Sequence, residues 1–62
     1  MTREELLQAI SFTSGFCGLE EFEYYETHNN INKFIEWYKE DISFCTQEGK
    51  ELGTKVIASL LA

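Results

Sequence analysis

The 62-residue sequence contains no proline, no long apolar run and only two cysteines. Without proline, no position is barred from a helix interior, so helices can extend over most of the chain. The longest uncharged, mainly apolar stretch, residues 56–62, is far shorter than the roughly 20 residues that span a bilayer as a helix. Glu4 and Glu5 stand where a secretory signal would carry positive charge. We therefore expect a cytoplasmic protein that does not bind membranes.

The two cysteines, Cys17 and Cys45, allow at most one disulfide, and nothing in the sequence indicates secretion. We expect two reduced and largely buried thiols. His28, the only histidine, is 11 residues from Cys17 and 17 residues from Cys45. A structural zinc site needs four ligands, usually in closely spaced pairs, and a nucleophilic thiol needs a base within hydrogen-bond reach. The sequence therefore predicts no catalytic residue, no metal site and no cofactor, and we expect a protein that is not an enzyme.

Positive charge is absent from Glu4 to Asn32, a stretch that holds six glutamates. Residues 33–62 carry four lysines against five acids, so most of the net charge of −6 belongs to the first half. Such a chain repels phosphate backbones and has no basic patch. We therefore expect no direct contact with nucleic acid.

The glutamates of the second predicted segment form a candidate acidic face for a partner with a basic surface. Such a face would steer association and select partners more than it would add affinity. A solvated acidic surface without a partner is the alternative. One form of the partner hypothesis is a nucleic-acid mimic of the type made by phages and mobile elements, although only the first half is acidic enough. The candidate residues are Glu20, Glu21, Glu23 and Glu26.

The most strongly periodic stretch, residues 31–45, is the predicted central helix. At about 100° per residue its apolar side chains share one arc of the width that faces a core. Trp37 and Phe44 fall outside this arc, seven residues apart on one flank. We interpret this aromatic ridge as a candidate contact for a partner helix or a second copy, with burial in the core as the alternative. The predicted core stripe comprises Ile31, Phe34, Ile35, Tyr38, Ile42 and Cys45.

Two further helices are expected, at residues 2–11 and 46–61. Thr2 and Glu5 have the spacing of a capping box at the start of the first, and a break at residues 13–15 ends it. Thr46 is the predicted N-cap of the last helix, just as Asn30 or Asn32 would cap the central one. The last helix carries two glycines on its apolar face, which predict either close approach of another backbone or a shorter helix that begins near the second; these are Gly49 and Gly53.

Residues 16–28 fit a helix or a strand. The glutamates and leucine favour a helix and the aromatic residues favour a strand, while Glu26 falls inside the apolar arc of the helix. We predict a single all-α domain over residues 1–62, a small bundle of three to four short helices packed on the central one. The alternative is an α+β fold with one hairpin that pairs residues 22–25 with residues 43–46.

The last residues are unusually apolar for a chain end, so Leu60 is expected to close the core while Leu61 stays partly exposed. Leu60 and Leu61 are also a candidate oligomer contact. Taken together, the sequence predicts a non-enzymatic protein-binding module, a small acidic inhibitor or regulator that meets a basic surface on its protein partner. The alternative from another class is a structural homo-oligomer, such as a homodimer, assembled through the aromatic and apolar helix face.

Overall fold

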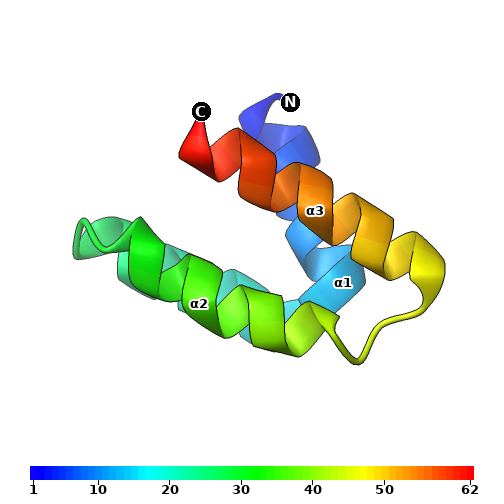
Figure 1. Cartoon of the computed structure of the whole chain (residues 1–62). Helices are drawn as coiled ribbons and strands as arrows, with labels where there is room; N and C mark the ends of the chain where they lie inside the picture. The colour runs from blue at the N-terminus through cyan, green and yellow to red at the C-terminus, as the bar shows by residue number, and fades with distance from the viewer.

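A computed structural model describes all residues of the chain, 1–62, and shows three helices and no strand (Figure 1). The helices are α1 (Arg3–Thr27), α2 (Ile31–Ile42) and α3 (Gln47–Leu61). The all-α prediction is confirmed, and the alternative hairpin is wrong. Residues 22–25 lie inside α1, and residues 43–46 form the connection between α2 and α3. No helix combines the length and apolar composition that crossing a membrane requires.

The start of α1 has the predicted capping box. The Thr2 hydroxyl accepts a hydrogen bond from the Glu5 backbone N–H at 3.1 Å, and the Glu5 carboxylate accepts one from the Thr2 backbone N–H at 2.9 Å. These two bonds satisfy donors that have no partner inside the helix. Hydrogen bonding from Thr2 also holds the pKa of Glu5 below its ordinary value, because the charged carboxylate is the better acceptor.

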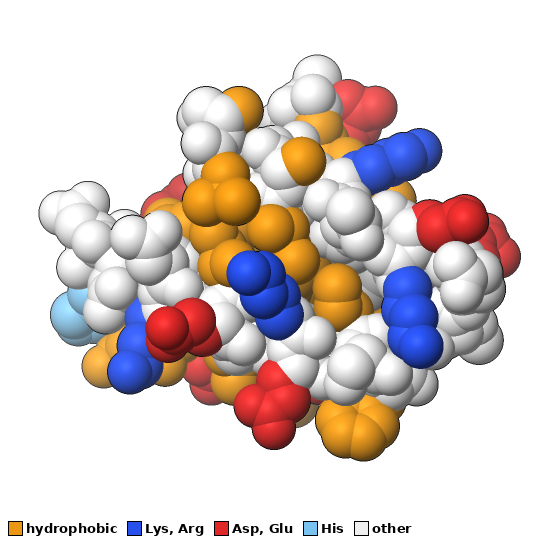
Figure 2. All heavy atoms as spheres, viewed as in Figure 1, with side chains coloured by type: hydrophobic (Ala, Val, Ile, Leu, Met, Phe, Trp, Pro, Cys, Tyr) orange, Lys and Arg blue, Asp and Glu red, His pale blue; other side chains and the backbone are white.

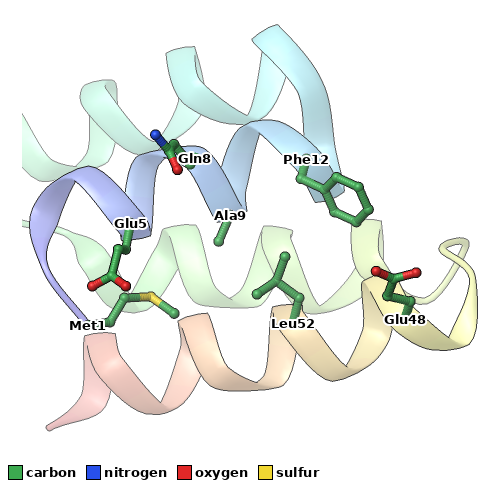
Figure 3. Close-up of a pocket in the computed structure, with 7 residues that line it drawn as sticks. All are labelled: Met1, Glu5, Gln8, Ala9, Phe12, Glu48 and Leu52. Carbon is green, nitrogen blue, oxygen red and sulfur yellow. The ribbon is translucent and has the colours of Figure 1, made fainter.

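A sharp kink at Gly15 divides α1 into two halves, residues 3–14 and residues 16–27. Gly15 has φ 66° and ψ −159°, a region that glycine alone adopts readily. The two halves fold back on each other, as the ribbon in Figure 3 shows, and this brings Arg3 to Glu26. With the two halves counted separately, the molecule contains four helical segments. The break predicted at residues 13–15 is confirmed, and the kink lies at its glycine.

An ion pair joins the two ends of the folded α1. The two terminal nitrogens of the Arg3 guanidinium each donate to one carboxylate oxygen of Glu26 at 2.7 Å. The guanidinium also lies 5.8 Å from the ring centroid of Phe22. Glu26 is the charged residue that falls inside the apolar arc of the predicted helix. The structure confirms the helix and resolves the conflict, because Arg3 faces Glu26 across the hairpin formed by the two halves of α1.

The core lies where α2 packs against both halves of α1 and against α3. Phe34 packs edge-on against Phe22 with ring centroids 5.2 Å apart, and it stacks on Tyr38 at 5.3 Å. The predicted stripe of α2 is confirmed, with four of its members buried and Ile31 half-buried at the helix start. The buried core cluster comprises Ala9, Ile10, Phe22, Phe34, Tyr38, Ile42 and Val56.

α2 ends at Ile42, three residues before the predicted end. The backbone N–H groups of residues 43, 44 and 45 bond to carbonyls three residues back instead of four, which tightens the chain into turns. The Ser43 hydroxyl also donates to the Glu40 carbonyl, a bond that competes with helix continuation. At the other end Asn30 occupies the N-cap as predicted, but its side chain makes no capping bond.

α3 begins at Gln47, where the Thr46 hydroxyl accepts from the Gly49 backbone N–H at 3.3 Å. The N-cap prediction is confirmed, and the alternative of a shorter helix starting near Gly53 is wrong. Gly49 and Gly53 are both buried. The close approach they permit is to side chains, since Gly49 lies against Cys45 and Gly53 against Ile42.

A small polar network holds the kink against α2. The hydroxyl oxygens of Tyr38 and Thr13 lie 2.6 Å apart, and the Thr13 hydroxyl donates to the Ala9 carbonyl at 2.9 Å. The Cys45 thiol donates to the Thr13 carbonyl at 3.3 Å. Tyr38 is fully buried, and this burial raises its pKa. One hydroxyl beside the kink, that of Ser14, is buried without a partner.

Candidate interaction surface

The charge asymmetry of the sequence becomes an asymmetry between helices. α1 contains six glutamates and one basic residue, Arg3, so its formal charge is −5. All four lysines lie on α2 and α3 among five acids. Figure 2, viewed from the side of α2 and α3, shows basic and acidic side chains interspersed around apolar ones. The acidic character therefore belongs to the hairpin that the two halves of α1 form.

The structure brings together only part of the predicted acidic face. Glu20 and Glu23 are exposed and stand three residues apart on α1, so they are neighbours on the helix surface. Glu21 is half-buried on another side. Glu26 is neutralised by Arg3, whose hydrogen bonds hold the pKa of Glu26 below its ordinary value. Glu20 and Glu23 are thus the pair that remains free for a partner.

Glu20 and Glu23 rim a groove of about 520 Å³ in the bend of α1, which we call the α1 groove. Exposed Phe16, with 73% of its surface accessible, lies in the same groove. The groove has one basic residue, Arg3, and that guanidinium is taken up by Glu26. The remaining lining residues are apolar side chains from both halves of α1: Leu7, Leu19 and Phe22.

A second hollow, of about 410 Å³, lies on the other side of Glu20 and Glu23. It contains Tyr24 and His28, whose ring centroids are 4.3 Å apart. The His28 Nδ1 lies 2.7 Å from the Tyr24 carbonyl, which fixes the imidazole at the C-cap of α1. Tyr24 is 57% exposed, so the acidic pair has an accessible aromatic ring on each side.

A third groove, of about 490 Å³, runs between α1 and α3, and we call it the α1–α3 groove (Figure 3). No pattern within one helix predicts this groove, because its walls come from two helices. Phe12 was the available signal, since it lies off the apolar face of the first predicted helix and is 63% exposed in the structure. The lining residues are Met1, Glu5, Gln8, Ala9, Phe12, Glu48 and Leu52.

The predicted aromatic ridge is not a ridge on one helix. Trp37 is half-buried and packs on Phe34 with ring centroids 5.9 Å apart, so it belongs partly to the core. Phe44 lies beyond the end of α2 and is 86% exposed. Both residues nevertheless line one hollow of about 250 Å³, together with Glu40 and Asp41.

The chain end and the cysteines complete the set of predicted positions. Leu60 is half-buried against the core, whereas Leu61 is 64% exposed. Neither cysteine is in a disulfide; Cys45 is half-buried, and Cys17 is exposed, so the expectation of a buried thiol is wrong there. No group of three or more histidine, cysteine, aspartate or glutamate side chains is arranged to hold a metal ion.

Comparisons of the chain with protein-family models, with curated proteins and with solved structures found no match. The chemistry of the surface is therefore what supports a functional proposal. Its main features are exposed aromatic side chains, free carboxylates beside them, and the absence of an unpaired lysine or arginine in either large groove.

Proposed function

We propose that this protein is a non-enzymatic protein-binding module, a small inhibitor or regulator that recognises a basic amphipathic surface on its partner. One observation carries the proposal: the α1 groove combines exposed Phe16 with the free carboxylates of Glu20 and Glu23. Its only basic residue is occupied by an internal ion pair with Glu26. A complementary partner would present apolar side chains flanked by lysine or arginine.

The two components of the groove would do different work. Burial of Phe16 and Leu19 by a partner would supply most of the affinity, since aromatic anchors in desolvated pockets dominate interfaces. The carboxylates of Glu20 and Glu23 would orient the partner and raise the association rate, an effect that falls with ionic strength. The net charge of −6 would repel acidic competitors.

Nucleic-acid mimicry is the less favoured form of this proposal. A mimic presents carboxylates along most of one side, in the way that a phosphate backbone does. Here the free carboxylates of α1 are accompanied by exposed aromatic rings, and the lysines of α2 and α3 interrupt the acidic surface on the remaining face. The structure therefore favours a basic amphipathic protein surface as the partner.

Selection of binders from a displayed library of random peptides tests the proposal. Selected peptides should carry a net positive charge with apolar residues between the basic ones, and they should elute as salt is raised. The Glu20→Gln/Glu23→Gln variant should retain them weakly. The matched control, Glu36→Gln/Glu51→Gln, removes the same charge from exposed sites on α2 and α3 and should retain them. Selection of neutral or acidic peptides, or equal loss in both variants, would contradict the proposal.

A structural homo-oligomer is the second candidate, and the exposure of Phe44 favours it. Phe44, which is 86% accessible before the start of α3, and exposed Leu61 at the end of that helix leave apolar surface for a second copy. Sedimentation at micromolar concentration should then detect a dimer that Phe44→Ser converts to monomer. A single 7.2 kDa species at all concentrations would reject this candidate.

A further inference from the structure

The α1–α3 groove has two helical walls with a regular pattern. Glu5, Gln8, Ala9 and Phe12 are spaced at i, i+3, i+4 and i+7 on α1, so they form one stripe along that helix. Ala9 is buried and forms part of the floor with half-buried Leu52 of α3. Figure 3 shows Met1 and Glu5 at one end of this groove. Phe12 and Glu48 lie at the other end.

The charged side chains of this groove are both negative and lie at its ends, while the α-ammonium group of Met1 is a positive charge near Glu5. Glu5 and Glu48 are both exposed, and no lysine or arginine lines the groove. Neither carboxylate takes part in an ion pair, because the only ion pair in the structure joins Arg3 to Glu26. The capping box keeps Glu5 in its charged form without occupying the whole carboxylate, since one oxygen accepts the Thr2 N–H. The groove therefore has an apolar middle with a carboxylate at each end, and the α-ammonium group of Met1 offsets part of the negative charge at the Glu5 end.

The spacing of these ends defines the complementary ligand. Glu5 and Phe12 are seven residues apart on α1, which corresponds to about 10 Å along a helix axis. Glu48 lies at the Phe12 end, so the two carboxylates lie at opposite ends of the groove. A helical ligand spans the same distance between residues i and i+7, and its residues i+3 and i+4 project between them on the same face.

We propose that the α1–α3 groove is a second docking site, which binds an amphipathic helix carrying basic residues at i and i+7 and apolar residues at i+3 and i+4. The apolar pair would pack on Phe12, Ala9 and Leu52, and the basic residues would meet Glu5 and Glu48. This site shares no residue with the α1 groove. It therefore stands or fails independently of the function proposed above.

The probe is a synthetic helical peptide with lysines at i and i+7 and leucines at i+3 and i+4, titrated into isotope-labelled full-length chain. Backbone amide shifts should change at Gln8, Ala9 and Leu52, and binding should weaken as salt is raised. A second peptide with glutamate in place of each lysine should bind at least tenfold more weakly. Equal binding of the two peptides, or the absence of shift changes at millimolar peptide, would overturn the proposal.

Variants separate the groove from the general acidity of the chain. Glu5→Gln/Glu48→Gln should weaken binding by about five- to tenfold, the size expected for two exposed ion pairs. Glutamine at position 5 retains the capping box, so the helix start is preserved. The matched control, Glu4→Gln/Glu51→Gln, removes the same charge from the same two helices outside the groove and should change binding less than twofold.

Phe12→Ala tests the apolar part of the groove and should weaken binding at least tenfold without unfolding the exposed site. Equal weakening by the two double-glutamine variants would show bulk electrostatic attraction and refute a defined site. Shift changes centred on Phe16 and Glu20 would place the peptide in the α1 groove, which also refutes the second site while supporting the first. Self-association that Phe12→Ala abolishes would make a second copy the occupant and overturn the proposal as stated.

Discussion

Gly53 of α3 contacts Ile42 at the end of α2. From this contact we predict that the effect of Gly53→Ala on stability changes sign with the side chain at position 42. A Cβ added to Gly53 would lie 2.7 Å from Cδ1, 2.9 Å from Cγ2 and 3.3 Å from Cβ of Ile42. Carbon atoms in ordinary contact are about 3.5–4.0 Å apart. The two helices can therefore meet at their present separation only because position 53 has no side chain.

Two effects of Gly53→Ala oppose each other. Alanine in a helix interior is more favourable than glycine by about 1 kcal/mol. Overpacking of a core contact costs about 1–3 kcal/mol. Since Ile42 is buried and presents three atoms to the new methyl group, we expect the second effect to dominate. The substitution should lower the free energy of unfolding by up to about 2 kcal/mol.

Shortening the side chain at position 42 should reduce the overpacking cost of Gly53→Ala in steps. Ile42→Val deletes only Cδ1, costs about 0.5–1.5 kcal/mol by itself and should reduce the cost of Gly53→Ala. Ile42→Ala deletes Cδ1, Cγ1 and Cγ2, costs about 2–5 kcal/mol, and leaves a cavity that the new methyl group partly fills. In that background Gly53→Ala should stabilise the protein by about 1 kcal/mol.

Urea unfolding followed by circular dichroism and by Trp37 fluorescence measures each free energy. Glu51→Ala is the control, because Glu51 is exposed on the same helix and its effect should add to that of Ile42→Ala within about 0.5 kcal/mol. The predicted clash with Ile42 is refuted if Gly53→Ala stabilises the wild-type protein. It is also refuted if its effect is the same in all three backgrounds.

Three further predictions concern the kink, the buried tyrosine and the ion pair. Gly15→Ala should destabilise the protein by about 1–3 kcal/mol in urea unfolding although no atom lies within 4 Å of the new Cβ; D-alanine at Gly15 in a synthetic chain should instead be tolerated. Burial raises the pKa of Tyr38 above its ordinary value of 10.0, so above pH 10 the folded chain retains a proton that the unfolded chain loses, and stability should fall. Tyr38→Phe should remove this fall. A variant whose urea midpoint falls above pH 10 as much as that of the wild type would contradict the prediction. Arg3 holds the pKa of Glu26 below its ordinary value of 4.5, so the ion pair stabilises the fold above that pH and this stabilisation is lost as the pH falls. The urea midpoint of Glu26→Gln should therefore fall less between neutral and acid pH than that of the wild type.

Local signals in the sequence predicted the helices and most of their ends. The capping box of Thr2 and Glu5, the N-cap Thr46 and the break at Gly15 each depend on a few adjacent residues, and the structure confirms all three. The end of α2 was predicted three residues too late. Periodicity alone extended that helix to Cys45, whereas side-chain and backbone hydrogen bonds of Ser43 end it earlier.

The candidate surfaces were less accessible to sequence reasoning. Glu20 and Glu23 were identified as free carboxylates, but Glu26 was grouped with them because its partner Arg3 lies 23 positions away. Periodicity placed Trp37 outside the core stripe, with burial as the alternative, and in the structure it is half-buried against the core and packs on Phe34. For Glu26 the deciding contact comes from another part of the chain, and a pattern within one segment does not contain it.

The amino-acid sequence alone indicated most of the helical segments, the apolar side of α2 and the acidic half of the chain, and it left residues 16–28 between helix and strand. These properties depend on local propensity, capping and spacing, which act within a few residues. Only the tertiary structure decided that α1 folds back on itself at Gly15, that Arg3 neutralises Glu26, and that two grooves with acidic rims form beside it. A groove lies between elements, so its shape and charge depend on the path of the chain in space.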